Sequence, residues 1–96
     1  MKNGVHRQRI LFQPGVIVIT QGAREALSQD DVLNSLVRHF GGDWGELDKQ
    51  DWEENNRALK SGHRLFSQYF TPEARKFWVI TEHDRSATTI LLPQEY

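Results

Sequence analysis

Three segments with alternating apolar residues, spanning 64–70, 76–82 and 87–92, constrain the fold of this chain most strongly. A period of two is that of a β-strand whose side chains point alternately to two faces. The connecting segments 71–75 and 83–86 are five and four residues long, which is the length of hairpin loops. The sequence therefore predicts a three-stranded antiparallel meander, which Pro93 ends.

Two helices are predicted before the meander. Ser28 and Asp31 form a capping box at the start of a helix over 28–40, and Gly41-Gly42 ends it. Its apolar positions are spaced to line one helix face: Val32, Leu33, Leu36, Val37 and Phe40.

The second helix is predicted over 49–61, with Asp48 as its N-cap and Gly62 just past its end. Leu47 and Trp52 have the spacing of a hydrophobic staple. Either Asn55 or its neighbour Asn56 is expected to be buried, with its amide bound to loop or strand backbone.

The β-branched run over 16–20 predicts a further strand, buried on both faces, at the edge or the centre of the sheet. Thr20 is placed to cap a short helical turn over 22–27. The predicted fold is thus α+β: one two-layer domain over residues 1–96, with residues 1–9 as a loose lead-in. Both longer helices are expected to cover one face of the antiparallel sheet.

Composition places the chain among folded globular proteins, with 38% apolar and 26% charged residues. The absence of cysteine excludes disulfides and thiolate chemistry and fits a reducing compartment. No apolar run approaches the roughly 20 residues of a membrane span. We therefore expect a soluble cytoplasmic protein without membrane association.

Acidic residues are concentrated in one short segment. Residues 43–54 carry six acids and one lysine, a balance of −5, whereas the flanking parts each carry +2. Much of this charge is accounted for by capping and by the helix dipole. Because no basic stripe is present, direct binding of nucleic acid is not expected.

Candidate binding residues lie in two segments. Asp43, Trp44 and Glu46 belong to a glycine-flanked loop, in which the tryptophan is either folded into the core or exposed as an interface anchor. Asp84 and Arg85 belong to the turn 83–86. That turn either presents an acid, a base and a guanidinium together, or is a plain polar turn in which Asp84 binds its own backbone.

No motif for catalysis, phosphate binding or metal binding is found. The four histidines lack the spacing of zinc ligands, and the acids of 43–54 do not follow the EF-hand order. We therefore expect no cofactor and no metal, and an enzyme is the less favoured class.

Four motifs carry a resemblance to a known family: GDWGEL (42–47), DWEEN (51–55), WVITE (78–82) and DRSATTILLP (84–93). With these residues the chain resembles a family of small uncharacterised bacterial proteins that are described as plasmid- or phage-related. Some members carry the label of a type I restriction methylase subunit. The resemblance extends from about Gly15 to Tyr96. It implies a mobile-element context and no established activity.

Three hypotheses for function follow. The first is a non-enzymatic interaction or accessory module, with the 43–54 segment and Trp44 contacting a protein partner or a second copy. The second is a small metal-dependent hydrolase or nuclease, which requires the 43–47 loop to approach the 83–86 turn and would use Glu46 and His83 with the other candidates. The third is an anti-restriction protein that mimics DNA through its acids.

Overall fold

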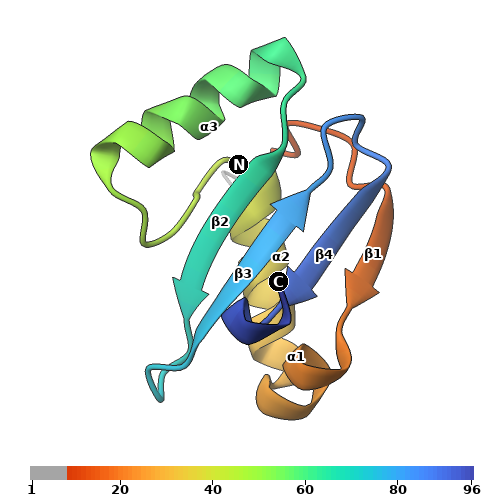
Figure 1. The fold of residues 1–96 in the computed structure, drawn as a ribbon, viewed down its shortest axis with the longest axis vertical. Coiled ribbons are helices and arrows are strands. Elements are labelled where there is room, and N and C mark those ends of the chain that lie inside the picture. The colour runs from red at the N-terminus through yellow and green to blue at the C-terminus, as the bar shows by residue number, and fades with distance from the viewer. Residues whose placement is uncertain (1–8) are drawn as a thin grey trace, which may run out of the picture.

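A sheet with helices packed behind it and beside it makes up the structure (Figure 1). The computed structural model describes residues 9–96, so the expected lead-in lies outside the described residues except for Arg9. The elements, in chain order, are β1 (Val16–Ile19), α1 (Gln21–Ala26), α2 (Gln29–Phe40), α3 (Lys49–Ser61), β2 (Leu65–Phe70), β3 (Lys76–Thr81), β4 (Ala87–Leu91) and the 3-10 helix η1 (Pro93–Glu95). The predicted α+β class is confirmed.

The C-terminal meander is confirmed. β3 pairs antiparallel with both β2 and β4, and its register aligns Ser67, Val79 and Ile90 across the three strands. The alternating faces also agree with the prediction. One face, here called the inner face, carries the most deeply buried strand residues: Leu65, Ser67, Tyr69, Phe77, Val79, Thr81, Thr88 and Ile90.

Strand β1 departs from the prediction. It lies at the edge of the sheet and pairs in parallel with β4, in the order β1-β4-β3-β2. Instead of being buried on both faces, Val16, Ile17 and Val18 are 67%, 41% and 41% exposed. A short β-branched run is typical of any strand, and its composition does not say how many neighbours the strand has.

Helix α2 crosses behind the sheet and covers its inner face (Figure 1). The predicted capping box is present, because Asp31 N–H donates to Ser28 Oγ and Ser28 N–H donates to the Asp31 carboxylate. The short helix α1 is capped by Thr20 as predicted, since its hydroxyl accepts from the N–H of Ala23.

Helix α3 begins after the N-cap Asp48, as predicted, and ends at Gly62 in the left-handed conformation. It does not join α2 over the sheet face. It lies along the outer edge of β2 instead (Figure 1). A separate apolar cluster lies beneath it and consists of Trp44, Ala58 and Leu65, with Phe12, Leu47, Trp52 and Leu59 packed around them. Within residues 9–96, no helix has the length and apolar character needed to cross a bilayer.

Candidate functional site

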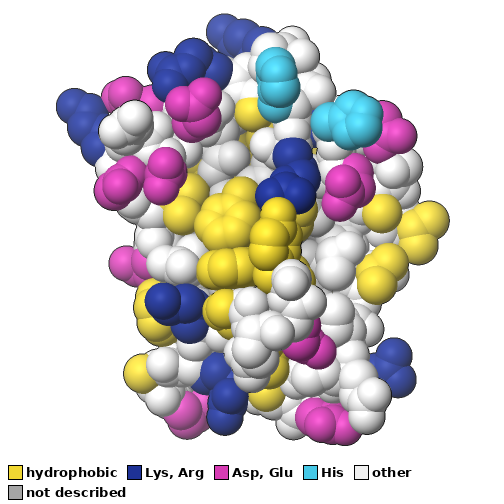
Figure 2. All heavy atoms as spheres, viewed as in Figure 1, with side chains coloured by type: hydrophobic (Ala, Val, Ile, Leu, Met, Phe, Trp, Pro, Cys, Tyr) yellow, Lys and Arg dark blue, Asp and Glu magenta, His cyan; other side chains and the backbone are white. Residues whose placement is uncertain are grey.

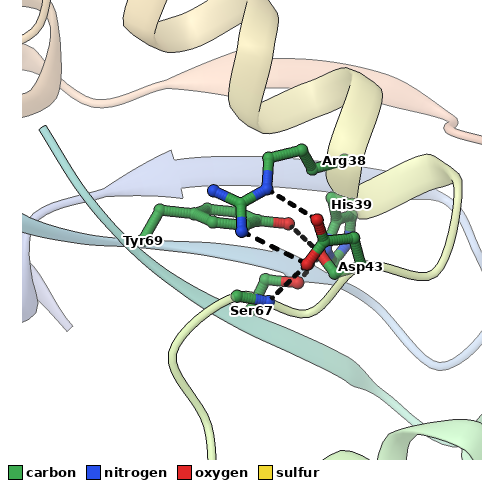
Figure 3. A network of polar contacts seen from close by, with 6 residues as sticks. Arg38, His39, Asp43, Ser67 and Tyr69 are labelled. Carbon is green, nitrogen blue, oxygen red and sulfur yellow. Dashed lines mark hydrogen bonds and ion pairs between the residues drawn. The ribbon is translucent and has the colours of Figure 1, made fainter.

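The 43–47 loop is fixed at the end of α2 by Asp43 (Figure 3). Arg38 Nε donates to Asp43 Oδ2 over 2.8 Å, and Gly45 N–H donates to Oδ1 over 3.1 Å. The guanidinium of Arg38 also lies 4.7 Å from the centre of the Tyr69 ring, whose hydroxyl donates to the Asp43 carbonyl. The hydrogen bond from Arg38 holds the pKa of the Asp43 carboxyl below its usual value. Asp43 therefore joins α2, β2 and the loop.

Trp44 is fully buried, with an exposed fraction of 0%. Its ring packs near Phe12 and His39, and its Nε1–H donates to Asn56 Oδ1 over 2.9 Å. The sequence left open whether Trp44 is folded into the core or exposed as an interface anchor, and in the structure it lies in the core. Trp44 therefore offers no ring surface to a partner, and an exposed anchor at this position is excluded.

The backbone on either side of Gly45 pairs with the outer edge of β2. Gln68 N–H donates to the Trp44 carbonyl over 3.1 Å, and Glu46 N–H donates to the Gln68 carbonyl over 2.7 Å. The side chain of Glu46 points to solvent. Next along the same edge, Asn55 is buried and binds both backbone groups of Phe66, as expected for one of the two asparagines. The outer edge of β2 is thus covered by side-chain and loop hydrogen bonds from Phe66 to Gln68.

Asp84 and Arg85 form the turn between β3 and β4. Ser86 N–H donates to Asp84 Oδ1 over 3.0 Å. Of the two alternatives for this turn, this is the plain polar turn in which Asp84 binds nearby backbone. Hydrogen bonds from Ser86 lower the pKa of the Asp84 carboxyl. The guanidinium of Arg85 donates to the carbonyls of Ala58 and His63, over 3.0 and 2.6 Å, and to two carbonyls of its own turn. Arg85 therefore ties the end of α3 to the β3–β4 turn.

The structure does not bring the two candidate segments into one polar site. Asp43 is bound to Arg38, whereas Arg85 is bound to backbone carbonyls, and the ring of Phe12 lies between Trp44 and the Arg85 guanidinium. Across residues 9–96, no hydrogen bond or ion pair joins 43–47 to 83–86. Nor does that part of the chain contain a group of three or more His, Asp or Glu side chains placed to hold a metal ion.

A buried polar chain centred on His39 was not predicted from the sequence. His39 is 0% exposed, with Ser67 Oγ 2.6 Å from Nδ1 and Thr81 Oγ1 2.9 Å from Nε2. Thr81 Oγ1 in turn lies 2.8 Å from Thr88 Oγ1, which donates to the carbonyl of Pro14. Figure 3 shows His39 and Ser67 facing each other between α2 and β2.

The direction of each hydrogen bond in this buried series follows from the last one, between Thr88 and the Pro14 carbonyl, since a hydroxyl has one proton to donate. Thr88 uses its proton on Pro14, so Thr81 donates to Thr88, and His39 Nε2–H donates to Thr81. Burial, reinforced by the positive charge of Arg85, lowers the pKa of His39 to about 3, so the ring is neutral and Nδ1 accepts from Ser67. The Ser67–His39 pair has the partners of a hydrolytic dyad, but both side chains lie out of contact with solvent.

Several exposed apolar side chains lie on β1 and on the neighbouring flank of α2. In addition to Val16, Ile17 and Val18 of β1, two side chains of α2 are exposed, Leu33 by 54% and Val37 by 45%. On α2, the side chains of Asp31, Asn34 and Arg38 lie on the flank toward β2, where they line a hollow together with Tyr69. Helix geometry then turns Leu33 and Val37 to the opposite flank, toward β4 and β1. We call Val16, Ile17, Val18, Leu33 and Val37 together the β1 surface. Ile17 lies on the α2 side of the sheet, and Val16 and Val18 lie on the other side of the edge strand.

A hollow of about 280 Å³ opens next to this surface, at the end of β1. Its apolar lining comes from Ile19, Leu27 and Val32, and its rim from Arg24, Ser28 and Gln29. Hydrophobic side chains are visible at the β1 side of the molecule in Figure 2. An uncharged edge strand with exposed apolar side chains on both of its faces makes this region a candidate contact surface.

The fold and these sites define the chain as a small α+β domain with a four-stranded mixed sheet. Comparison with known proteins finds no matching family model, no matching curated protein and no matching solved structure.

Proposed function

We propose that this chain is a non-enzymatic protein-interaction module whose contact region is the β1 surface. The observation that carries the proposal is the exposed edge strand itself: β1 leaves three consecutive β-branched side chains partly in solvent, with Ile17 on the face that α2 covers and Val16 and Val18 on the other face. Exposed edge strands invite pairing with another strand, and proteins that do not use them usually protect them with charges, prolines or bulges. Residues 16–19 contain no charge and no proline.

The surroundings of the polar residues favour binding over catalysis. Asp43, Asp84 and Arg85 hold loops and a helix end in place through hydrogen bonds. The His39–Ser67 pair is enclosed by the sheet and α2. These residues have sufficient structural roles without a reaction. The 43–54 segment, which the sequence predicts as the contact region, has its tryptophan in the core and its acids Asp48 and Asp51 in the N-terminal turn of α3.

The biological setting of the proposal rests on the resemblance of the motifs in 42–47 and 78–93 to plasmid- and phage-related proteins. We propose on that basis an accessory gene product of a mobile element. The cysteine-free sequence is compatible with the cytoplasm as its compartment.

Affinity capture from the native host tests the proposal. Tagged wild-type protein is compared with Val18→Lys, which puts a charge on the β1 surface, and with Phe70→Lys. Phe70 lies on the opposite edge strand and is similarly exposed, 44% against 41% for Val18. We expect a co-purifying protein that is lost with Val18→Lys and retained with Phe70→Lys. Equal recovery with all three proteins would contradict the β1 surface as the contact region.

A further inference from the structure

The outer edge of β1 carries backbone groups that point away from the sheet. Val16 N–H donates to the Ser86 carbonyl, and Thr20 N–H donates to the Ile90 carbonyl, so residues 16, 18 and 20 turn their backbone groups toward β4. Ile17 and Ile19 therefore direct theirs outward. Within residues 9–96, no hydrogen bond reaches this outer edge. A strand is the partner whose donors and acceptors match such an edge.

The opposite edge of the sheet is closed to such pairing from Phe66 to Gln68. Asn55 occupies the outward backbone groups of Phe66, and the Trp44–Glu46 segment occupies those of Gln68. Extension of the sheet is therefore directed to β1.

We infer that the β1 surface binds a second copy of this chain through antiparallel β1–β1 pairing, an inference that rests on the proposed function. A two-fold axis at Val18 sets Ile17 of each copy opposite Ile19 of the other. In this register all four outward N–H and C=O groups of each β1 are paired, because Ile17 and Ile19 each exchange two hydrogen bonds across the axis. The same surface patch serves both copies, as an isologous interface requires.

The side chains support this register. Residues opposite each other in an antiparallel pair project to the same face. Ile17 of the second copy then projects to the inner face beside Ile19, where the hollow lined by Ile19, Leu27 and Val32 opens. Its volume of about 280 Å³ accommodates a branched aliphatic side chain. The segment 16–20 carries no charge, so two copies meet at this strand without repulsion between like charges.

A cysteine at position 18 tests the axis directly. Val18 meets its own counterpart as a non-hydrogen-bonded pair, for which the Cα atoms lie about 4.5 Å apart. This distance falls within the roughly 4.4–6.8 Å of a disulfide. Because the natural chain has no cysteine, the introduced thiol has only its counterpart to react with. Phe70→Cys, at a similarly exposed position on β2, is the matched control.

Under mild oxidation of the full-length proteins, we expect Val18→Cys to form a covalent dimer on non-reducing gels and Phe70→Cys to remain largely monomeric. In sedimentation equilibrium, we expect the wild type to be a dimer and Ile17→Lys to be a monomer with an unchanged circular dichroism spectrum. A wild-type monomer from micromolar to millimolar concentration would overturn the inference, as would cross-linking of Val18→Cys no greater than that of the control.

Failure of this inference is distinguishable from failure of the proposed function. A monomeric protein that captures a different chain through Val18 removes the second copy and keeps the interaction surface. A monomeric protein whose captured chains do not depend on Val18 removes both.

Discussion

Asn55 binds Phe66 as a neighbouring strand would. Its side-chain amide donates to the Phe66 carbonyl over 2.5 Å and accepts from the Phe66 N–H over 3.1 Å. A primary amide has the same donor and acceptor as a peptide group, so one side chain of α3 replaces one residue of a strand. This pairing fixes α3 against the edge of β2 and explains why the helix does not lie over the sheet face.

Replacing Asn55 should destabilise the fold in proportion to the hydrogen bonds lost. We expect Asn55→Ala to lower the free energy of unfolding by about 1–3 kcal/mol, because two backbone groups lose their partner at a partly buried edge. Asn55→Asp should cost more, since a carboxylate accepts from the Phe66 N–H but repels its carbonyl. Urea unfolding measures both. Glu53→Ala, at an exposed position of the same helix, is the control and should change stability by about 0.5 kcal/mol or less. Equal effects at positions 53 and 55 would contradict the pairing.

The buried His39 should make stability depend on pH between its unfolded and folded pKa values. Burial lowers the pKa from 6.5 to about 3 in the folded protein. Between these values the unfolded chain binds a proton that the folded protein does not, so stability falls as pH falls. The slope contributed by one such proton is about 1.4 kcal/mol per pH unit. Below about pH 3 both states are protonated, and this contribution ends.

Urea unfolding from pH 6 down to pH 5 isolates this effect from most carboxylate titration. We expect His39→Gln to be less stable than the wild type at neutral pH and to show a shallower slope in this range. His83→Gln, in an exposed turn, serves as the matched control and should keep the wild-type slope. A wild-type slope in His39→Gln would contradict a neutral, buried His39.

The features predicted correctly depend on residues close together in sequence. The meander follows from alternation and short connectors, and the helix starts follow from Ser28, Asp31 and Asp48, whose hydrogen bonds span three residues. The burial of one asparagine of α3 followed from its place between Trp52 and Leu59. Signals of this kind can be recognised from a short window of the sequence, because the residues that form them are close together in the chain.

The features missed depend on tertiary register. Ser67, Thr81 and Thr88 come together with His39 only once three strands are aligned over α2. Three polar residues at inner-face positions of the predicted strands were the available signal, but nothing in the sequence linked them to His39. The exposure of β1 was missed for the same reason, because the number of neighbours of a strand is set by topology.

Ala74 is held in a backbone conformation that favours glycine. Its φ is +68°, whereas left-handed geometry costs an L-residue roughly 1–2 kcal/mol. We expect Ala74→Gly to raise the free energy of unfolding by up to about 1 kcal/mol, after the added flexibility of glycine in the unfolded chain is subtracted. Glu73→Gly, one residue earlier in the same turn with an ordinary negative φ, should lower stability instead. Thermal unfolding of the two variants gives the sign of each change, and loss of stability in both would contradict the strain.

Gly45 and Gly62 separate backbone strain from steric exclusion. Both have a positive φ, +81° and +77°. A Cβ on Gly62 would meet nothing within 4 Å, but a Cβ on Gly45 would lie 2.1 Å from the Gln68 carbonyl oxygen, which is backbone and cannot turn away. We expect Gly62→Ala to cost about 1 kcal/mol of stability, the cost of left-handed geometry alone. Gly45→Ala should cost roughly 3 kcal/mol or more, because the loop must leave the edge of β2 and take Trp44 with it.

Hydrogen exchange of the Gln68 amide reports where this loss arises. Its N–H donates to the Trp44 carbonyl in the folded protein, so it should be protected in the wild type and in Gly62→Ala. Detachment of the loop in Gly45→Ala exposes that amide while the amides paired between β3 and β4 stay protected. Equal destabilisation by the two alanines, with the Gln68 amide protected in both, would mean that the close approach of Gly45 to β2 does not position the Trp44 loop.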